Sequence, residues 1–326
     1  KTGKKNSKTT VSYNTYTGFQ EASRVLPLLN ATEYALLLNE SYAAGGQALP
    51  FANVTGLGKG TDWQREILNT AVPIISHDFN VSGGSEKITY AISGSHLYQQ
   101  GIIAPKKSDF RRNTARLSLG ADISDKLRVK ANAIYTYIDR DAINDNGLGS
   151  VLFNALNAPS TLSAFDSNGQ PTLIPNTAGL GIEIINPIAQ IQNTFNDFDS
   201  RKVNGTVSLE YDIIDNVTLT SRVGFNTTNS EGKNFNKEVD YGGKVFDVPR
   251  SSVNQNSIND NDYSLDIFGT YKNMFSDVHN VQFTIGTTVY KQFGNGLFAT
   301  GFDVPNNSWE FADIALAVGT SDGGAR

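Results

Sequence analysis

The chain has 326 residues, and its 27 Lys and Arg against 32 Asp and Glu give a formal net charge of −5. That balance leaves no extended basic surface, which argues against a nucleic-acid partner. The absence of Cys excludes disulfide bonds and thiol catalysis. No apolar run approaches the roughly 18 residues of a transmembrane helix. A transmembrane β-barrel stays compatible with the composition, because its strands alternate lipid-facing and lumen-facing residues.

The N-terminal part of the chain combines one strand with a long connection. Polar and basic residues 1–8 lead into a predicted strand over Thr9–Gln20, where apolar side chains recur at every second position. A long connection over 21–75 follows. It contains two capping signals, which begin at Asn30 and at Thr61 and each predict a helix.

Two long hairpins are predicted between Ser76 and Arg140. From Leu127 to Tyr137 every second residue is apolar or aromatic, and most of the residues between them are polar. A period of two is typical of a strand with one apolar and one polar face. The predicted strands are about 10 to 13 residues long, roughly twice the length of an ordinary globular strand. Strands of this length suit a tilted crossing of a membrane.

The same pattern returns after a second long connection, 141–200. Hairpins are predicted over 203–227 and 263–289, with a long loop over 228–261 between them and another over 294–326 after them. This makes about nine strands, with short and long connections in alternation. Such an arrangement is typical of an up-and-down outer-membrane barrel, with short turns on the periplasmic side and long loops outside. The fold class predicted is therefore all-β, a partial transmembrane antiparallel barrel.

The two faces of the predicted strands differ in chemistry. Aromatic residues on the apolar face form two rows, one near the short turns and one near the long loops, as interfacial girdles would. They are Tyr90, Tyr211 and Tyr271 in the first row, and Tyr98, Tyr137, Phe225 and Tyr263 in the second. The opposite face carries charges that a dry core would not tolerate. They are Arg116, Asp122, Arg128, Lys130, Glu210, Arg222, Asp266 and Lys272. A wet lumen and the solvent side of a soluble sheet both suit these charges.

Nothing in the sequence predicts an enzyme, a cofactor or a metal site. His77, His96 and His279 lack metal-ligand spacing. The run Gly294–Ala299 fits a dinucleotide fingerprint formally, but it opens no helix, so a loop is expected there. The acidic run Asn259–Asp262 lacks the glycine and distal Glu of an EF-hand loop, so we expect a solvated loop end.

Binding is expected in the long outer loops, because loops on a rigid scaffold commonly carry recognition. Asp62, Trp63, Phe153 and Phe165 are the candidates for contact with a ligand or with a lid protein. Aromatic faces stack on sugars, and carboxylates accept hydrogen bonds from them. The alternative for Trp63 is that it anchors the first long connection on the rim.

A series of short motifs along the chain gives it a family resemblance. The chain resembles SusC/RagA-type TonB-dependent outer-membrane transporters, and the order of the motifs carries the resemblance. The motifs are Val11–Asn14, Gly18–Gln20, Leu29–Tyr34, Gly60–Gln64, His77, Val81–Ser85, Gly101–Ile103, Phe110–Asn113 and Asn186-Pro187.

The resemblance implies a barrel of about 22 strands that is plugged by an N-terminal domain and energised through TonB. It also implies a SusD-like surface lipoprotein that captures glycans or peptides as a lid. Residues 1–8 would then end the connection from the plug, and 9–326 would form the N-terminal portion of the barrel. Both ends look cut, so we expect a longer polypeptide. The alternatives are a soluble or surface-attached β-rich binding or adhesion module and a passive porin-like channel.

Overall fold

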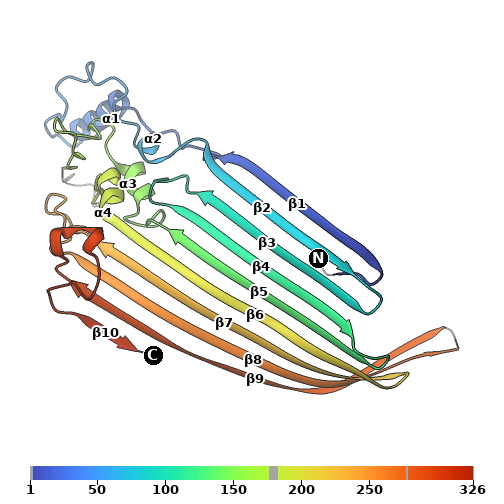
Figure 1. The fold of residues 1–326 in the computed structure, drawn as a ribbon. Coiled ribbons are helices and arrows are strands. Elements are labelled where there is room, and N and C mark those ends of the chain that lie inside the picture. Colours follow the sequence, from blue (N-terminus) through green and yellow to red (C-terminus); the bar gives the residue numbers. More distant parts are fainter. Residues whose placement is uncertain (1–2, 176–182, 277, 326) are drawn as a thin grey trace.

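The computed structural model describes residues 3–175, 183–276 and 278–325. Within these ranges ten strands form one antiparallel sheet, in which every strand pairs with its neighbours in the sequence. Short turns join the strands at one end of the sheet, and the helices gather at the other end (Figure 1). None of the helices in the described ranges is long and apolar enough to span a bilayer.

The strands confirm the up-and-down order predicted from the sequence. Their bounds are β1 (Ser7–Gln20), β2 (Val72–Gly84), β3 (Ile88–Gln100), β4 (Asp109–Asp122), β5 (Leu127–Asp141), β6 (Thr194–Ile214), β7 (Val217–Asn236), β8 (Ser252–Phe275), β9 (His279–Phe302) and β10 (Asp322–Ala325). The helices are α1 (Ala31–Ala44), α2 (Trp63–Ile67), α3 (Val151–Asn157) and α4 (Pro187–Asn193), with 3-10 turns η1 (Pro305–Asn307) and η2 (Trp309–Phe311).

The capping signals of the first connection form the helices that they predict. In α1 the Asn30 side chain accepts a hydrogen bond from the Glu33 N–H, and the Glu33 carboxylate accepts one from the Asn30 N–H, both over 3.0 Å. Gly45 is the C-cap of this helix, as expected. At the second signal the N-cap is Asp62, whose carboxylate accepts a hydrogen bond from the Arg65 N–H.

Strands β6 to β9 are much longer than the sequence pattern indicates. They have 21, 20, 24 and 24 residues. The loop predicted over 228–261 is therefore confined to 237–251, and residues 294–302 belong to β9 instead of a loop. The backbone ladder continues there without apolar alternation, because a strand that extends into water needs no apolar face. The glycine run that begins at Gly294 thus lies inside a strand.

The predicted loop over 141–200 is also more structured than expected. It contains the seven-residue helices α3 and α4, which are capped by Ser150 and Asn186. Its last residues, from Thr194, already pair with β7 as part of β6. Sequence periodicity does not find helices this short, because seven residues cover only about two turns.

Candidate functional site

The strand register keeps one face of the sheet apolar and the other polar. On the apolar face Val207 and Val223 lie opposite each other, and their side chains are 44% and 46% exposed. On the polar face the next pair is Ser208 and Arg222, where the Arg222 Nε donates a hydrogen bond to the Ser208 hydroxyl over 3.2 Å. Exposed apolar side chains at this density require a lipid environment. The polar face is therefore the lumen face.

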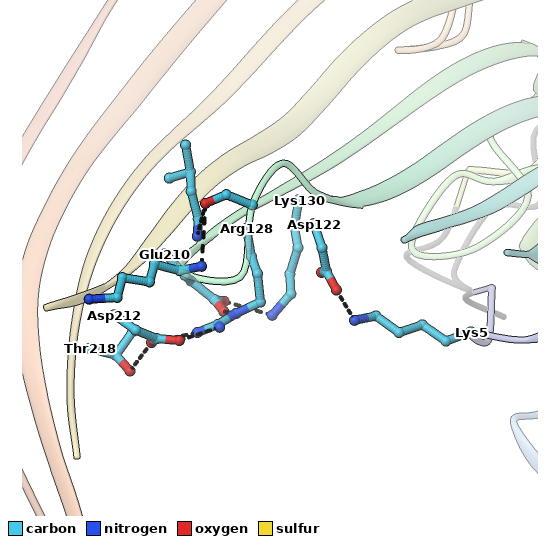
Figure 2. A network of polar contacts seen from close by, with 10 residues as sticks. Lys5, Asp122, Arg128, Lys130, Glu210, Asp212 and Thr218 are labelled. Carbon is cyan, nitrogen blue, oxygen red and sulfur yellow. Dashed lines mark hydrogen bonds and ion pairs between the residues drawn. The ribbon is translucent and has the colours of Figure 1, made fainter. Parts of the chain in front are cut away.

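An ion-pair network lies on the lumen face at the short-turn end of β5 to β7 (Figure 2). The Arg128 guanidinium donates two hydrogen bonds to the Asp212 carboxylate, over 2.5 and 2.8 Å. It also donates to Glu210 over 3.2 Å, and Glu210 accepts a further bond from the Lys130 ammonium over 2.6 Å. The Thr218 hydroxyl donates to Asp212 over 2.7 Å. Every charge in this network has a partner.

The N-terminal residues join the same end of the lumen face. The Asn6 N–H donates to the Ser85 carbonyl over 3.0 Å, so the chain before β1 lies against the β2–β3 turn. The Lys5 ammonium then pairs with the Asp122 carboxylate at the end of β4, as Figure 2 shows. Cations and carboxylates balance at this end of the sheet.

A pocket of about 790 Å³ lies at the opposite end, where the loops meet the strands. Side chains on the lumen face line it, including Gln20, Gln99, Phe110 and Arg140. The Gln99 amide donates to the Gln20 amide oxygen over 3.1 Å. The Arg140 guanidinium lies 5.1 Å from the ring centroid of Phe198. Amide, aromatic and guanidinium groups of this kind can bind polar ligands.

A small hydrophobic core holds the loops above this pocket, and we call these loops the loop layer (residues 61–69, 101–108 and 143–193 where described). Trp63 is 2% exposed and packs with Ile67, Val151 and Ala155. Its indole N–H donates to the Pro159 carbonyl over 3.0 Å. The core therefore ties α2 to α3.

Lys107 fastens the loop layer to the sheet. Its ammonium donates to the carbonyls of Gln192 and Thr194, over 2.9 and 3.1 Å, and lies 3.4 Å from the centroid of the Phe195 ring. Burial and, to a smaller extent, the positive charge of Lys237 lower the pKa of Lys107 to about 8. One side chain thus joins the β3–β4 connection to the start of β6.

The four contact residues predicted from the sequence occupy different environments. Trp63 is a core residue, in agreement with the anchor alternative. Asp62 caps α2 and pairs with Arg65 over 3.1 Å, while its side chain stays 51% exposed. Phe153 is half-buried on α3, and Phe165 is 41% exposed. Contact of these residues with a ligand or lid protein stays a prediction.

Arg140 and Gln99 are lumen-face residues that sequence reasoning missed, whereas the strand pattern already placed Gln20 on the polar face. The alternation of the strands could have revealed Arg140 and Gln99, because each residue continues the polar face of its strand. In β5 the predicted alternation ends at Tyr137, three residues before Arg140. Lys107 was missed as well, because no local pattern reveals a lysine that packs on distant carbonyls.

The side chains of His77 and His96 have ordinary protein partners. The Nδ1 atom of His77 lies 2.7 Å from the Tyr13 hydroxyl, and that of His96 lies 2.7 Å from the Asn113 amide oxygen. Within the described ranges no group of three or more His, Cys, Asp or Glu side chains is arranged to hold a metal ion.

An exposed apolar patch lies in the β1–β2 connection, and we call it the α1 patch. Its seven large aliphatic side chains are between 43% and 56% exposed. They are Val25, Leu26, Leu28, Leu29, Leu36, Leu37 and Leu49. The helix buries only Ala31 and Ala35. Large aliphatic side chains that are exposed outside the lipid zone are typical of an interface.

No family model matches the chain. Two TonB-dependent receptors of Formosa agariphila are similar to it in sequence. The receptor named P26 is 30% identical over 210 residues, which cover 64% of this chain and 20% of that protein. The receptor named P3 is 25% identical over 322 residues, which cover 94% of this chain and 29% of that protein. The chain thus spans less than a third of the length of either relative.

Solved structures of a peptide transporter have the same fold as this chain. The RagAB peptide transporter superimposes with a TM-score of 0.78 at 17% identity, over 100% of this chain and 40% of that chain. The RagAB peptide importer in its open-open state gives a TM-score of 0.73 at 18% identity, over 100% and 39%. In sequence the chain is similar to segments of TonB-dependent receptors, and in fold it matches part of the RagAB peptide transporter, as an antiparallel β-barrel wall.

Proposed function

We propose that the whole protein imports glycans or peptides across the outer membrane in a TonB-dependent manner, and binds its cargo without transforming it. One observation supports this proposal most directly. The sheet has an apolar face exposed to lipid and an opposite lumen face, which ends in a pocket of about 790 Å³ under the loop layer. A closed barrel wall with such a face encloses a polar path. Energy from TonB would open that path for bound cargo.

We further propose that a SusD-like surface lipoprotein covers the loop layer. The α1 patch supports this part of the proposal, because Leu36 and Leu37 are 52% and 56% exposed on a helix that lies outside the lipid zone. Asp62, Phe153 and Phe165 would contact cargo or the lid beside it. Trp63 would hold the layer together from within.

Uptake by cells that carry the full-length transporter tests the import. Labelled oligosaccharides and peptides should enter wild-type cells, and removal of the transporter or of TonB should abolish entry of the same compounds. Entry that continues without TonB would support a passive channel instead.

Co-purification tests the lid. Leu36→Asp with Leu37→Asp should lower recovery of the surface lipoprotein with the transporter by at least about tenfold, because two carboxylates would be buried in an apolar contact. Glu40→Gln on the same exposed helix is the control and should leave recovery unchanged. Equal recovery from both variants would remove the α1 patch from the interface.

A further inference from the structure

Four cations stand on the lumen face of β4, β5 and β6, between the middle of these strands and their ends at the loop layer. They are Arg112, Arg116, Arg140 and Lys202, and we call them the lumen cations. Among the described residues none of the four forms an ion pair. Arg112, Arg140 and Lys202 are exposed, and the Arg116 Nε atom is buried without a hydrogen-bond partner there. This is unlike the balanced network at the other end of the sheet.

The strand register places these cations in one group. Arg112 lies opposite Ile138, and Arg140 is two positions further along the same strand as Ile138. Lys202 lies opposite Thr136 of that strand. Only Arg112 and Arg140 are therefore diagonal neighbours, about 7 to 8 Å apart, whereas Lys202 lies two strands away from Arg112. A single oligomer lying across β4 to β6 could therefore meet several positive charges.

The chain neighbours of two lumen cations provide an internal comparison. Arg111, on the apolar face, pairs with Asp109 over 2.9 Å and with Asp139 over 3.1 Å. Arg201, on the same face, pairs with Asp199 over 3.1 Å and with Glu231 over 3.8 Å. Cations just outside the lipid zone thus receive carboxylates, whereas Arg112 and Lys202 on the lumen face do not.

Carboxylates are missing from the whole upper lumen face of these three strands. Between the strand ends and the level of Ser118, Asn132 and Ser208, the lumen-facing positions of β4, β5 and β6 carry no Asp or Glu. Two strands away on either side, Asp78 on β2 and Asp262 on β8 accept hydrogen bonds from the neutral side chains of Ser76 and Asn226 and keep their charge. Carboxylates do lie at the edge of the group, because Asp109, Asp141 and Asp145 line the same pocket as Arg140, and Asp78 lines a pocket with Arg116.

We propose that the lumen cations form a binding site for cargo with several carboxylate groups, such as an acidic oligosaccharide or an acidic peptide. The proposal rests on the import function proposed above and names the chemistry of its cargo. Guanidinium groups bind carboxylates through two parallel hydrogen bonds. The face of Phe198 orients the Arg140 guanidinium in advance. Ile134 and Ile138 lie between the cations and offer apolar contact to the backbone of the cargo.

Binding to the purified full-length transporter tests the site, with three probes of stated chemistry. Oligogalacturonate carries a carboxylate on each sugar, its methyl ester is the same oligomer without charge, and oligo-aspartate presents carboxylates on a peptide. The free acid should bind at least about tenfold more tightly than the ester, and added salt should weaken its binding by screening. The two acidic probes then distinguish a glycan from a peptide source.

Two double variants compare the lumen face of the sheet with its apolar face. Arg112→Gln with Lys202→Gln should weaken binding of the acidic probe at least about tenfold, because each charge-assisted hydrogen bond that is lost lowers the affinity. Arg111→Gln with Arg201→Gln removes the same charge from the neighbouring positions on the other face and should change affinity less than about twofold. Heat-modified migration on gels verifies that both variants still form barrels.

Three results would overturn the inference. They are equal affinity for the acid and its ester, equal affinity of the two double variants, and loss of barrel stability in the lumen variant with unchanged binding. The last would mean that the lumen cations pair with other parts of the same protein. If neutral and acidic cargo are imported alike, the proposed import stands and only the charge selectivity fails. If no cargo depends on the transporter, the proposed function fails with it.

Discussion

Trp63 determines how firmly the loop layer is held, because it is 2% exposed and its indole N–H has a defined acceptor. Trp63→Ala should destabilise the loop layer by about 3 to 5 kcal/mol through the cavity it leaves. Trp63→Phe keeps most of the packing but loses the indole hydrogen bond to the Pro159 carbonyl. It should therefore lower the stability of the loop layer by about 1 kcal/mol more than the lost apolar area alone predicts. Limited proteolysis of intact outer membranes measures this as faster cleavage within the loop layer.

Phe165→Ala is the matched control for this prediction, because Phe165 lies in the same connection as α3 but is 41% exposed. Its removal should leave the cleavage rate nearly unchanged. Equal protection of the Trp63→Ala variant and the wild type would show that the layer does not depend on this core.

Lys107 should react with acylating reagents at lower pH than an ordinary lysine. Its pKa of about 8 lies below the ordinary 10.5, because burial and Lys237 disfavour the charged form. Mass spectrometry after short pulses of acetylation should give a midpoint near pH 8 in the folded protein and near 10.5 after denaturation. Lys237→Gln should move the folded midpoint upward, since one of the two causes is removed.

The same shift has a definite sign for stability. Between about pH 8 and pH 10.5 the denatured chain retains the Lys107 proton that the folded chain has released. The contribution of this group to folding therefore grows as pH rises through that window. A midpoint of labelling near 10.5 in the folded protein would contradict both statements.

At the scale of elements, Arg128 on β5 forms ion pairs with Glu210 and Asp212 on β6 and so links the two strands. Arg128→Gln should lower the free energy of unfolding by about 1 to 2 kcal/mol, because it leaves two carboxylates without their cation in a wet lumen. The unfolding temperature of the barrel, followed by its migration on gels, measures the loss.

A double-mutant cycle separates the ion pair from other effects of the substitution. Arg128→Gln combined with Asp212→Asn should destabilise the barrel less than the sum of the single variants, since the second change removes an unpaired charge. Strictly additive effects would show that the two groups do not depend on each other.

At the scale of the whole molecule, the sheet is a lipid-facing wall, and adjacent residues of β6 experience opposite solvents. Val207→Lys places a charge on the apolar face at mid-strand and should cost about 2 to 4 kcal/mol. Thr206→Lys places it on the lumen face and should cost about 1 kcal/mol or less. The yield of folded barrel in the outer-membrane fraction compares the two. Equal yields of the two variants, with the protein in the soluble fraction, would contradict the membrane assignment.

The sequence predicted the strands best where lipid imposes its alternation. From Leu127 to Tyr137 the pattern follows β5 residue by residue, because each apolar side chain must face the bilayer. It failed above that zone, where β6 to β9 continue beside water on both faces and polar residues such as Asn259 fit either side. The capped helix α1 was predicted because its signal is local, whereas α3 and α4 depend on packing with Trp63.

The candidate site divides in the same way. The sequence alone determined that one face of the strands is charged, that the long connections share one end, and that Trp63 would act as an anchor or a contact. Only the tertiary structure decided which of these charges have partners. Arg128 and Arg112 have the same parity on neighbouring strands, yet Glu210 and Asp212 reach only the first. Whether a charge has a partner depends on the strand register between segments about 80 residues apart. An alternating pattern fixes the face on which each residue lies, but it does not distinguish registers that differ by two residues.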